Sequence, residues 1–142
     1  MIVRLKRNHI DYFRRKCILS RNEEYAILLG YRIAPALVEV HKWIYPKLSI
    51  KTPDNLETVV GEVEATHEVA RELGMVVVGD IHSHPDDDIA MSPTDFKDHR
   101  KHNHCITGIL SVNKNKTKLA FWEIDSPLPA SVQYIKPTKK KK

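Results

Sequence analysis

The sequence predicts an α/β domain in which helices are layered against a mixed β-sheet. Two segments place apolar residues at helical spacing, and runs rich in β-branched and aromatic residues lie between and after them. One run contains consecutive valines, which indicates a central strand covered on both faces. With 142 residues, 42% apolar and 29% charged, the chain can bury a core as one domain. We expect that domain to span residues 1–136, followed by a basic tail at 137–142.

The first predicted helix covers residues 9–19, where apolar side chains recur at helical spacing until Ser20–Asn22 interrupt them. The second covers residues 56–73 and ends at Gly74, because glycine favours the position just after a helix. A shorter helix is expected to begin near Pro93. The predicted strands are residues 25–33, 37–45, 75–81, 105–112, 118–124 and 131–135.

Neither a membrane span nor a secretory signal is expected. The longest apolar runs, Ala26–Leu29 and Met75–Val78, are far too short to cross a bilayer, and the first residues lack the apolar stretch of a signal peptide. We therefore expect a cytoplasmic protein. Cys17 and Cys105 lie 88 positions apart, which supports neither a disulfide framework nor a thiolate zinc site, so reduced thiols are expected.

The net charge of +5 raises the question of nucleic-acid binding. Lys139–Lys142 supply four of these charges, which leaves about +1 (5 − 4) for the rest of the chain. A short lysine run after Pro137 is typical of a solvated tail. The distribution of charge therefore argues against a nucleic-acid partner.

Two histidines stand at the end of the predicted strand 75–81. His82 and His84 are two positions apart, and side chains at i and i+2 of an extended chain leave the same face, so both imidazoles can converge on one ion. Zinc binds imidazole nitrogen and carboxylate oxygen, and three protein ligands with one open position are typical of a catalytic site. Taken alone, such a pair is more often two ordinary histidines.

The third ligand would be a carboxylate, and spacing alone leaves several candidates. Asp86–Asp88 are expected on an exposed turn. Asp95 follows Ser92, a good helix cap, so a helix starting there would present it from a rigid element. The same Ser-x-x-Asp pattern is also an ordinary capping box. Three further histidines fit a solvated helix end and loop, namely His99, His102 and His104.

The joint spacing from His82 to Asp95, His-x-His-x7-Ser-x2-Asp, resembles the signature of the JAMM (MPN-plus) metallopeptidases. That family also carries a glutamate seven positions before a glycine in an upstream strand. Glu23 has this spacing to Gly30, whereas Glu24 does not. The strand order and the helix before the histidines match too, so the resemblance spans about residues 9–125. It implies an MPN/JAMM-like single domain.

The resemblance implies a role for each residue of the signature. One zinc ion per chain would be bound by His82, His84 and Asp95. Glu23 would act as general base on the attacking water and later pass a proton to the leaving amine. Ser92 would donate a hydrogen bond to the oxyanion.

Asp80 departs from the family, in which a tryptophan often holds this position. As an acid beside the ligand strand, it is either support for a histidine or a surface residue. The long insertion with which larger members grip a second ubiquitin looks absent, because Asp95 and Cys105 are only ten positions apart.

By resemblance, the expected reaction is hydrolysis of an amide or isopeptide bond at the C-terminal tail of a ubiquitin-like or sulfur-carrier protein. Residues 47–52, bracketed by Pro46 and Pro53, alternate apolar and polar side chains, and the family pairs the substrate tail with an insertion at the corresponding place. An ordinary surface loop is the alternative for this segment. Two alternatives to the reaction stay open, a non-catalytic MPN-type scaffold that binds a partner protein and a zinc hydrolase of a small amide.

Overall fold

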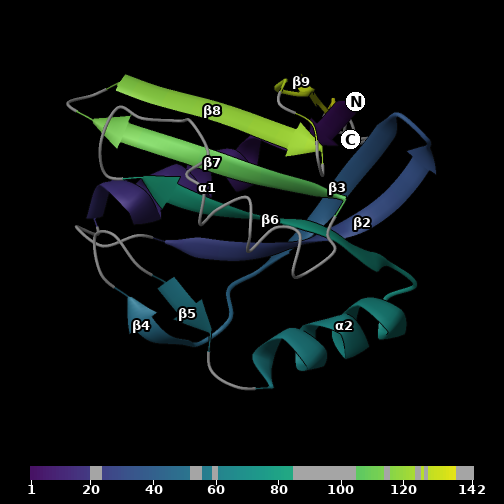
Figure 1. Cartoon of the computed structure of the whole chain (residues 1–142), viewed down its shortest axis with the longest axis horizontal. Coiled ribbons are helices and arrows are strands. Elements are labelled where there is room, and N and C mark those ends of the chain that lie inside the picture. Colours follow the sequence, from purple (N-terminus) through teal and green to yellow (C-terminus); the bar gives the residue numbers. More distant parts are fainter. Residues whose placement is uncertain are drawn as a thin grey trace, which may run out of the picture.

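The computed structural model describes residues 1–19, 24–51, 56–58, 61–84, 105–113, 116–123, 126 and 128–136. Within these residues, two helices accompany a seven-stranded sheet and a separate two-stranded sheet (Figure 1). The strand order of the larger sheet is β8-β7-β6-β2-β3-β1-β9. Its strands are β1 (Ile2–Leu5), β2 (Tyr25–Ala34), β3 (Leu37–Ile44), β6 (Val76–His84), β7 (Ile106–Asn113), β8 (Lys116–Glu123) and β9 (Ser131–Tyr134).

The larger sheet is mixed, as the sequence predicted. β2 pairs antiparallel with β3 and β6, and β7 pairs antiparallel with β8. β6 pairs parallel with β7, and β1 pairs parallel with both β3 and β9. All six predicted strands are confirmed to within a few residues, and β6 is an inner strand, as its valines indicated. β1 was not predicted, because four residues are too short to show a clear alternation.

The helix α1 (Arg7–Leu19) covers one face of the sheet and confirms the first predicted helix. Its buried residues Ile10, Phe13 and Cys17 belong to the main hydrophobic core. The sheet contributes even-numbered residues of β2, such as Ala26 and Leu28, to the same core. Alternation along the strand explains this, since every second side chain of β2 leaves the same face.

The helix α2 (Glu62–Glu72) covers the other face, where its Ala70 packs with Ile27 and Leu29 (Figure 1). The predicted start at residue 56 was wrong, because Leu56–Thr58 form β5, which pairs with β4 (Leu48–Lys51) in the two-stranded sheet. Gly61 separates β5 from α2 with a φ of +89°, a conformation that glycine adopts without strain and that a helix interior excludes. This glycine, inside the predicted helix, was the overlooked signal.

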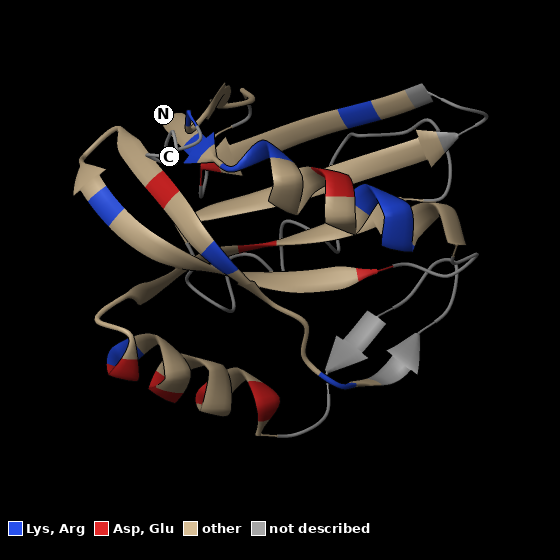
Figure 2. Cartoon of the chain, turned by 180° about the vertical axis from the view of Figure 1, so that it is seen from behind, with Lys and Arg blue, Asp and Glu red and all other residues tan. Residues whose placement is uncertain are grey.

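The two helices carry opposite charges (Figure 2). Glutamates dominate α2, which has acidic residues throughout and Arg71 in its last turn, whereas α1 has lysine in its last turn and no acid in its first. Neither helix within the described residues has the length and apolar character needed to span a membrane. Cys17 is buried and Cys105 half-buried, and no disulfide joins these two cysteines, both of which the structure describes.

Candidate functional site

The C-terminal half of β6 places Asp80, His82 and His84 on one face of the sheet. Alternate residues of a strand share a face, and Ile81 and Ser83 between them are buried on the α1 side. Tyr25 of β2 lies directly opposite His82. On the other side, β7 places one residue level with each member of the row: Thr107 beside Asp80, Ile109 beside His82 and Ser111 beside His84.

The two imidazoles converge as the sequence predicted. The Nε2 atoms of His82 and His84 lie 3.1 Å apart, and the rings meet edge to face at 63° with their centroids 4.9 Å apart. Both residues are half-buried. With zinc–nitrogen bonds of about 2.0–2.1 Å, this separation corresponds to a ligand–metal–ligand angle of roughly 98°, a distorted tetrahedral value. The pair therefore fits two positions of a zinc site, although the same separation also fits a hydrogen bond between the rings.

The other predicted site residues, Glu23, Ser92 and Asp95, lie outside the described residues. The same is true of the alternative ligands Asp86–Asp88 and of the three further histidines at 99, 102 and 104. Within the part of the chain that the structure describes, no group of three or more His, Cys, Asp or Glu side chains could hold a metal ion. The described structure thus brings together two predicted ligands.

Glu24 lies across from Ser83 and is buried, with 6% of its surface exposed. Its backbone N–H donates to Ser83 Oγ at 2.7 Å, and the Ser83 N–H donates to the Glu24 carbonyl at 2.9 Å. Ser83 and the even-numbered residues of β2 that follow Glu24 face α1, whereas His82 and His84 face the opposite side. Glu24 therefore lies on the α1 side of the sheet, the face opposite to that of the histidines.

Asp80 is buried, with 7% of its surface exposed, so the surface reading of this residue was wrong. Its carboxyl group accepts two hydrogen bonds, from Thr107 Oγ1 to Oδ1 at 2.5 Å and from the Tyr25 hydroxyl to Oδ2 at 3.1 Å. Tyr25 thus reaches from its position opposite His82 to a group two residues further back along β6. Sequence analysis missed Tyr25 and Thr107, because only the pairing of distant strands brings them to Asp80.

The chain is similar to known proteins in sequence and in fold. The profile of a protein family described as prokaryotic homologs of the JAB domain matches residues 7–125. Protein DSY2949 from Desulfitobacterium hafniense has a similar solution structure, with a TM-score of 0.75, 18% identity and coverage of 96% of this chain and 94% of that one. The solution structure of a Salinibacter ruber protein is also similar, with a TM-score of 0.66, 19% identity and coverage of 97% of this chain and 95% of that one. Because the sequence identities are this low, the two solved structures show similarity of fold alone. No curated protein matches the chain.

Proposed function

The chain belongs to the prokaryotic homologs of the JAB domain, and on that premise we propose that it is a zinc-dependent metallopeptidase that hydrolyses an amide or isopeptide bond. The observation that carries this proposal is the convergence of the Nε2 atoms of His82 and His84, 3.1 Å apart on one face of the sheet. Two neutral imidazoles and one carboxylate form a donor set that suits zinc.

In this proposal β6 holds His82 and His84 in place as two of the zinc ligands. The third ligand, the general base and the oxyanion donor are Asp95, Glu23 and Ser92. A bound zinc ion lowers the pKa of water toward 7 and polarises the scissile carbonyl group. Glu23 takes a proton from the attacking water and delivers one to the leaving amine, a role worth about 10²–10⁴-fold in rate. Ser92 donates a hydrogen bond to the oxyanion.

The proposed substrate is a ubiquitin-like or sulfur-carrier protein, cut at its C-terminal tail. An extended tail needs a strand edge to pair with, and β4 supports this idea because residues 48–51 are a strand. β4 pairs with β5 on one side, and no other strand of the described chain pairs with it. We propose that the tail pairs with this second edge.

Metal analysis tests the ligands. We expect about one zinc per chain in the wild type, strong loss in His84→Ala and no change in His102→Ala, because only the first residue belongs to the converging pair. Elemental analysis of purified protein, with competition against a chelator of known affinity, gives the content and the Kd. Full zinc content in His84→Ala, with loss in His102→Ala, would show that the ligand assignment is wrong.

Comparison of Glu23→Gln with Glu24→Gln tests the catalytic base. Glu23→Gln should keep its zinc and its fold but lose turnover of a ubiquitin-like protein extended at its C-terminus. Glu24→Gln should keep turnover, since Glu24 lies on the opposite face from the histidines. Equal activity of wild type and Glu23→Gln would exclude Glu23 as the base. A wild type that binds the ubiquitin-like protein without cutting it would instead identify the non-catalytic scaffold.

A further inference from the structure

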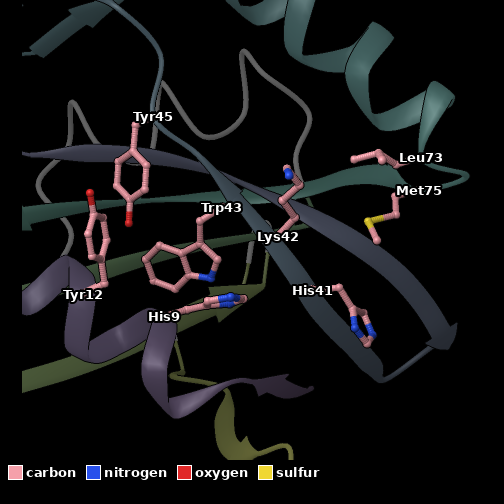
Figure 3. A pocket seen from close by; sticks show the side chains of 8 residues that line it. All are labelled: His9, Tyr12, His41, Lys42, Trp43, Tyr45, Leu73 and Met75. Carbon is pink, nitrogen blue, oxygen red and sulfur yellow. The ribbon is translucent and has the colours of Figure 1, made fainter.

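A pocket of about 470 Å³ lies along β3 (Figure 3). In the strand order, β2 separates β3 from β6, the strand that carries the histidine pair. Such a volume is typical of sites that hold a ligand or the side chains of a partner. Its lining residues come from α1, from β3 with the residue after it, and from the connection between α2 and β6: His9, Tyr12, His41, Lys42, Trp43, Tyr45, Leu73 and Met75.

The strand edge beside this pocket belongs to β3. β1 pairs with β3 only from Leu37 to Glu39 and then leads into α1. Along Val40–Ile44, no strand of the described chain pairs with the outer edge of β3. An open edge offers backbone N–H and C=O groups to an added strand. Five residues of strand extend for about 17 Å, enough for a short peptide segment.

Side chains form a wall on each side of this edge. On the α1 side, His9 and Tyr12 stand beside Trp43 and Tyr45, with the rings of Tyr12 and Tyr45 5.6 Å apart (Figure 3). Leu73 and Met75 lie across the β3 ribbon from Trp43 (Figure 3). Because the edge lies between two walls, a single extended segment fits it better than the edge of a second sheet. Tyr12 and Leu73, both nearly half exposed, offer this segment apolar contact.

Three buried polar atoms of the pocket residues have no hydrogen-bond partner among the residues that the structure describes. They are His9 Nδ1, Trp43 Nε1 and Tyr45 Oη, and they are the three buried side-chain polar atoms without a partner in the described part of the chain. Such atoms are rare in folded proteins, and their gathering at one pocket calls for an explanation. A peptide backbone that enters the pocket, with a small rotation of these rings, can supply partners to them.

Two lysines lie at the pocket. Lys42 lines it, and the Lys16 ammonium group lies 5.0 Å from the Tyr45 ring centre and 5.9 Å from that of Tyr12. The nearby carboxylate of Glu39 already contacts His41 at 3.0 Å and Arg4 at 3.4 Å. An acidic partner therefore complements this edge.

We propose that the pocket and the open edge of Val40–Ile44 bind an extended, acidic peptide segment of a partner protein as an added strand on β3. This interaction is separate from the histidine site and does not rest on the proposed enzymatic function. Backbone pairing with β3 provides the alignment, and the aromatic wall contacts the apolar side chains on one face of the segment. Lys42, which is paired with Leu29 on the α2 side, faces the acidic side chains of the other face, and Lys16 adds positive charge beside the aromatic wall.

Hydrogen exchange with a defined peptide tests the proposal. The probe is the acetylated and amidated hexapeptide Glu-Val-Glu-Phe-Glu-Val. We expect it to slow the exchange of backbone amides within Val40–Ile44 by about tenfold or more, because pairing protects them from water. Two further peptides serve as controls, one N-methylated at alternate backbone nitrogens and one with lysine for each glutamate. Neither should slow exchange at these amides.

Matched variants locate the binding surface. Leu73→Asp and Lys42→Glu change exposed side chains of the pocket and should each raise the peptide Kd about tenfold or more. Ile33→Asp changes a similarly exposed apolar side chain in the turn region of the β2–β3 hairpin and should leave the Kd unchanged. Equal protection by the N-methylated peptide would overturn strand addition, and equal protection by the lysine peptide would overturn the acidic partner. Absence of any protection by the glutamate peptide would overturn the proposal altogether.

Discussion

Replacing Thr107 by valine tests whether the buried carboxyl group of Asp80 depends on its hydrogen bonds. Valine has nearly the shape of threonine, so the change removes the hydroxyl that donates to Asp80 Oδ1 and leaves little or no cavity. Both residues are more than nine-tenths buried, so water cannot readily replace the lost donor. Leaving a buried acceptor short of a partner costs about 1–3 kcal/mol, and a loss of 2 kcal/mol corresponds to roughly 4–8 °C in Tm for a domain of this size.

The decisive measurement repeats Thr107→Val in an Asp80→Ala background. There the threonine hydroxyl has already lost the carboxyl group, so removing it should cost about 0 kcal/mol or even stabilise the domain. Urea unfolding followed by tryptophan fluorescence gives all four free energies, with a chelator present so that bound metal does not contribute. The same loss of stability in both backgrounds would refute the idea that Thr107 stabilises the domain through Asp80.

Three further predictions concern other parts of the molecule. Gly79→Ala should destabilise the domain by about 1–3 kcal/mol or more in urea unfolding, because the added Cβ would lie within 3 Å of the Ile106 carbonyl oxygen. Gly61→Ala has open space around it and should cost only about 1 kcal/mol, for its positive φ. Equal losses of stability in the two variants would contradict this prediction. Burial, helped by the positive charges of Lys6 and His41, lowers the pKa of His9, so the folded state disfavours the protonated ring and stability should fall as the pH drops below 6.5. His9→Gln should weaken that dependence in unfolding curves between pH 7.5 and about 5.5, and an unchanged slope would exclude His9 as its source. Ser49→Pro and Ile50→Pro each remove a backbone donor from β4, and because neighbouring N–H groups point to opposite edges of a strand, one of the two donors faces the second edge. The variant that loses this donor should raise KM for a ubiquitin-like substrate without changing zinc content, whereas wild-type kinetics in both variants would exclude pairing at β4.

Local sequence patterns predicted most elements of the fold. Apolar periodicity located α1 and six strands of the larger sheet, because side-chain spacing follows directly from helix and strand geometry. The pattern failed between residues 56 and 61, where the helical spacing of Val59 and Val63 continued through a segment that contains β5 and Gly61. The positive φ of Gly61 is a backbone property that apolar spacing does not show.

Sequence patterns likewise predicted one part of the candidate site and missed another. Convergence of His82 and His84 followed from their spacing on one strand, and the structure places their Nε2 atoms 3.1 Å apart. The burial of Asp80 did not follow, since one donor, Thr107, is 27 positions away and the other, Tyr25, is 55 positions away. Those contacts depend on which strands flank β6 and in which register, and local periodicity contains neither piece of information.

The placement of β1 between β3 and β9 links the two ends of the sequence during folding. Ile2 pairs with Leu37 on one side and with Ser131 on the other, and the Arg4–Gln133 hydrogen bond spans 129 positions. A growing chain can therefore complete one side of β1 once β3 has been synthesised, while the other side waits until residues 131–134 follow. Until β9 arrives, β1 is the outermost strand and exposes an open edge to other chains. Aggregation during synthesis should accordingly begin at β1, at the opposite end of the sheet order from β8.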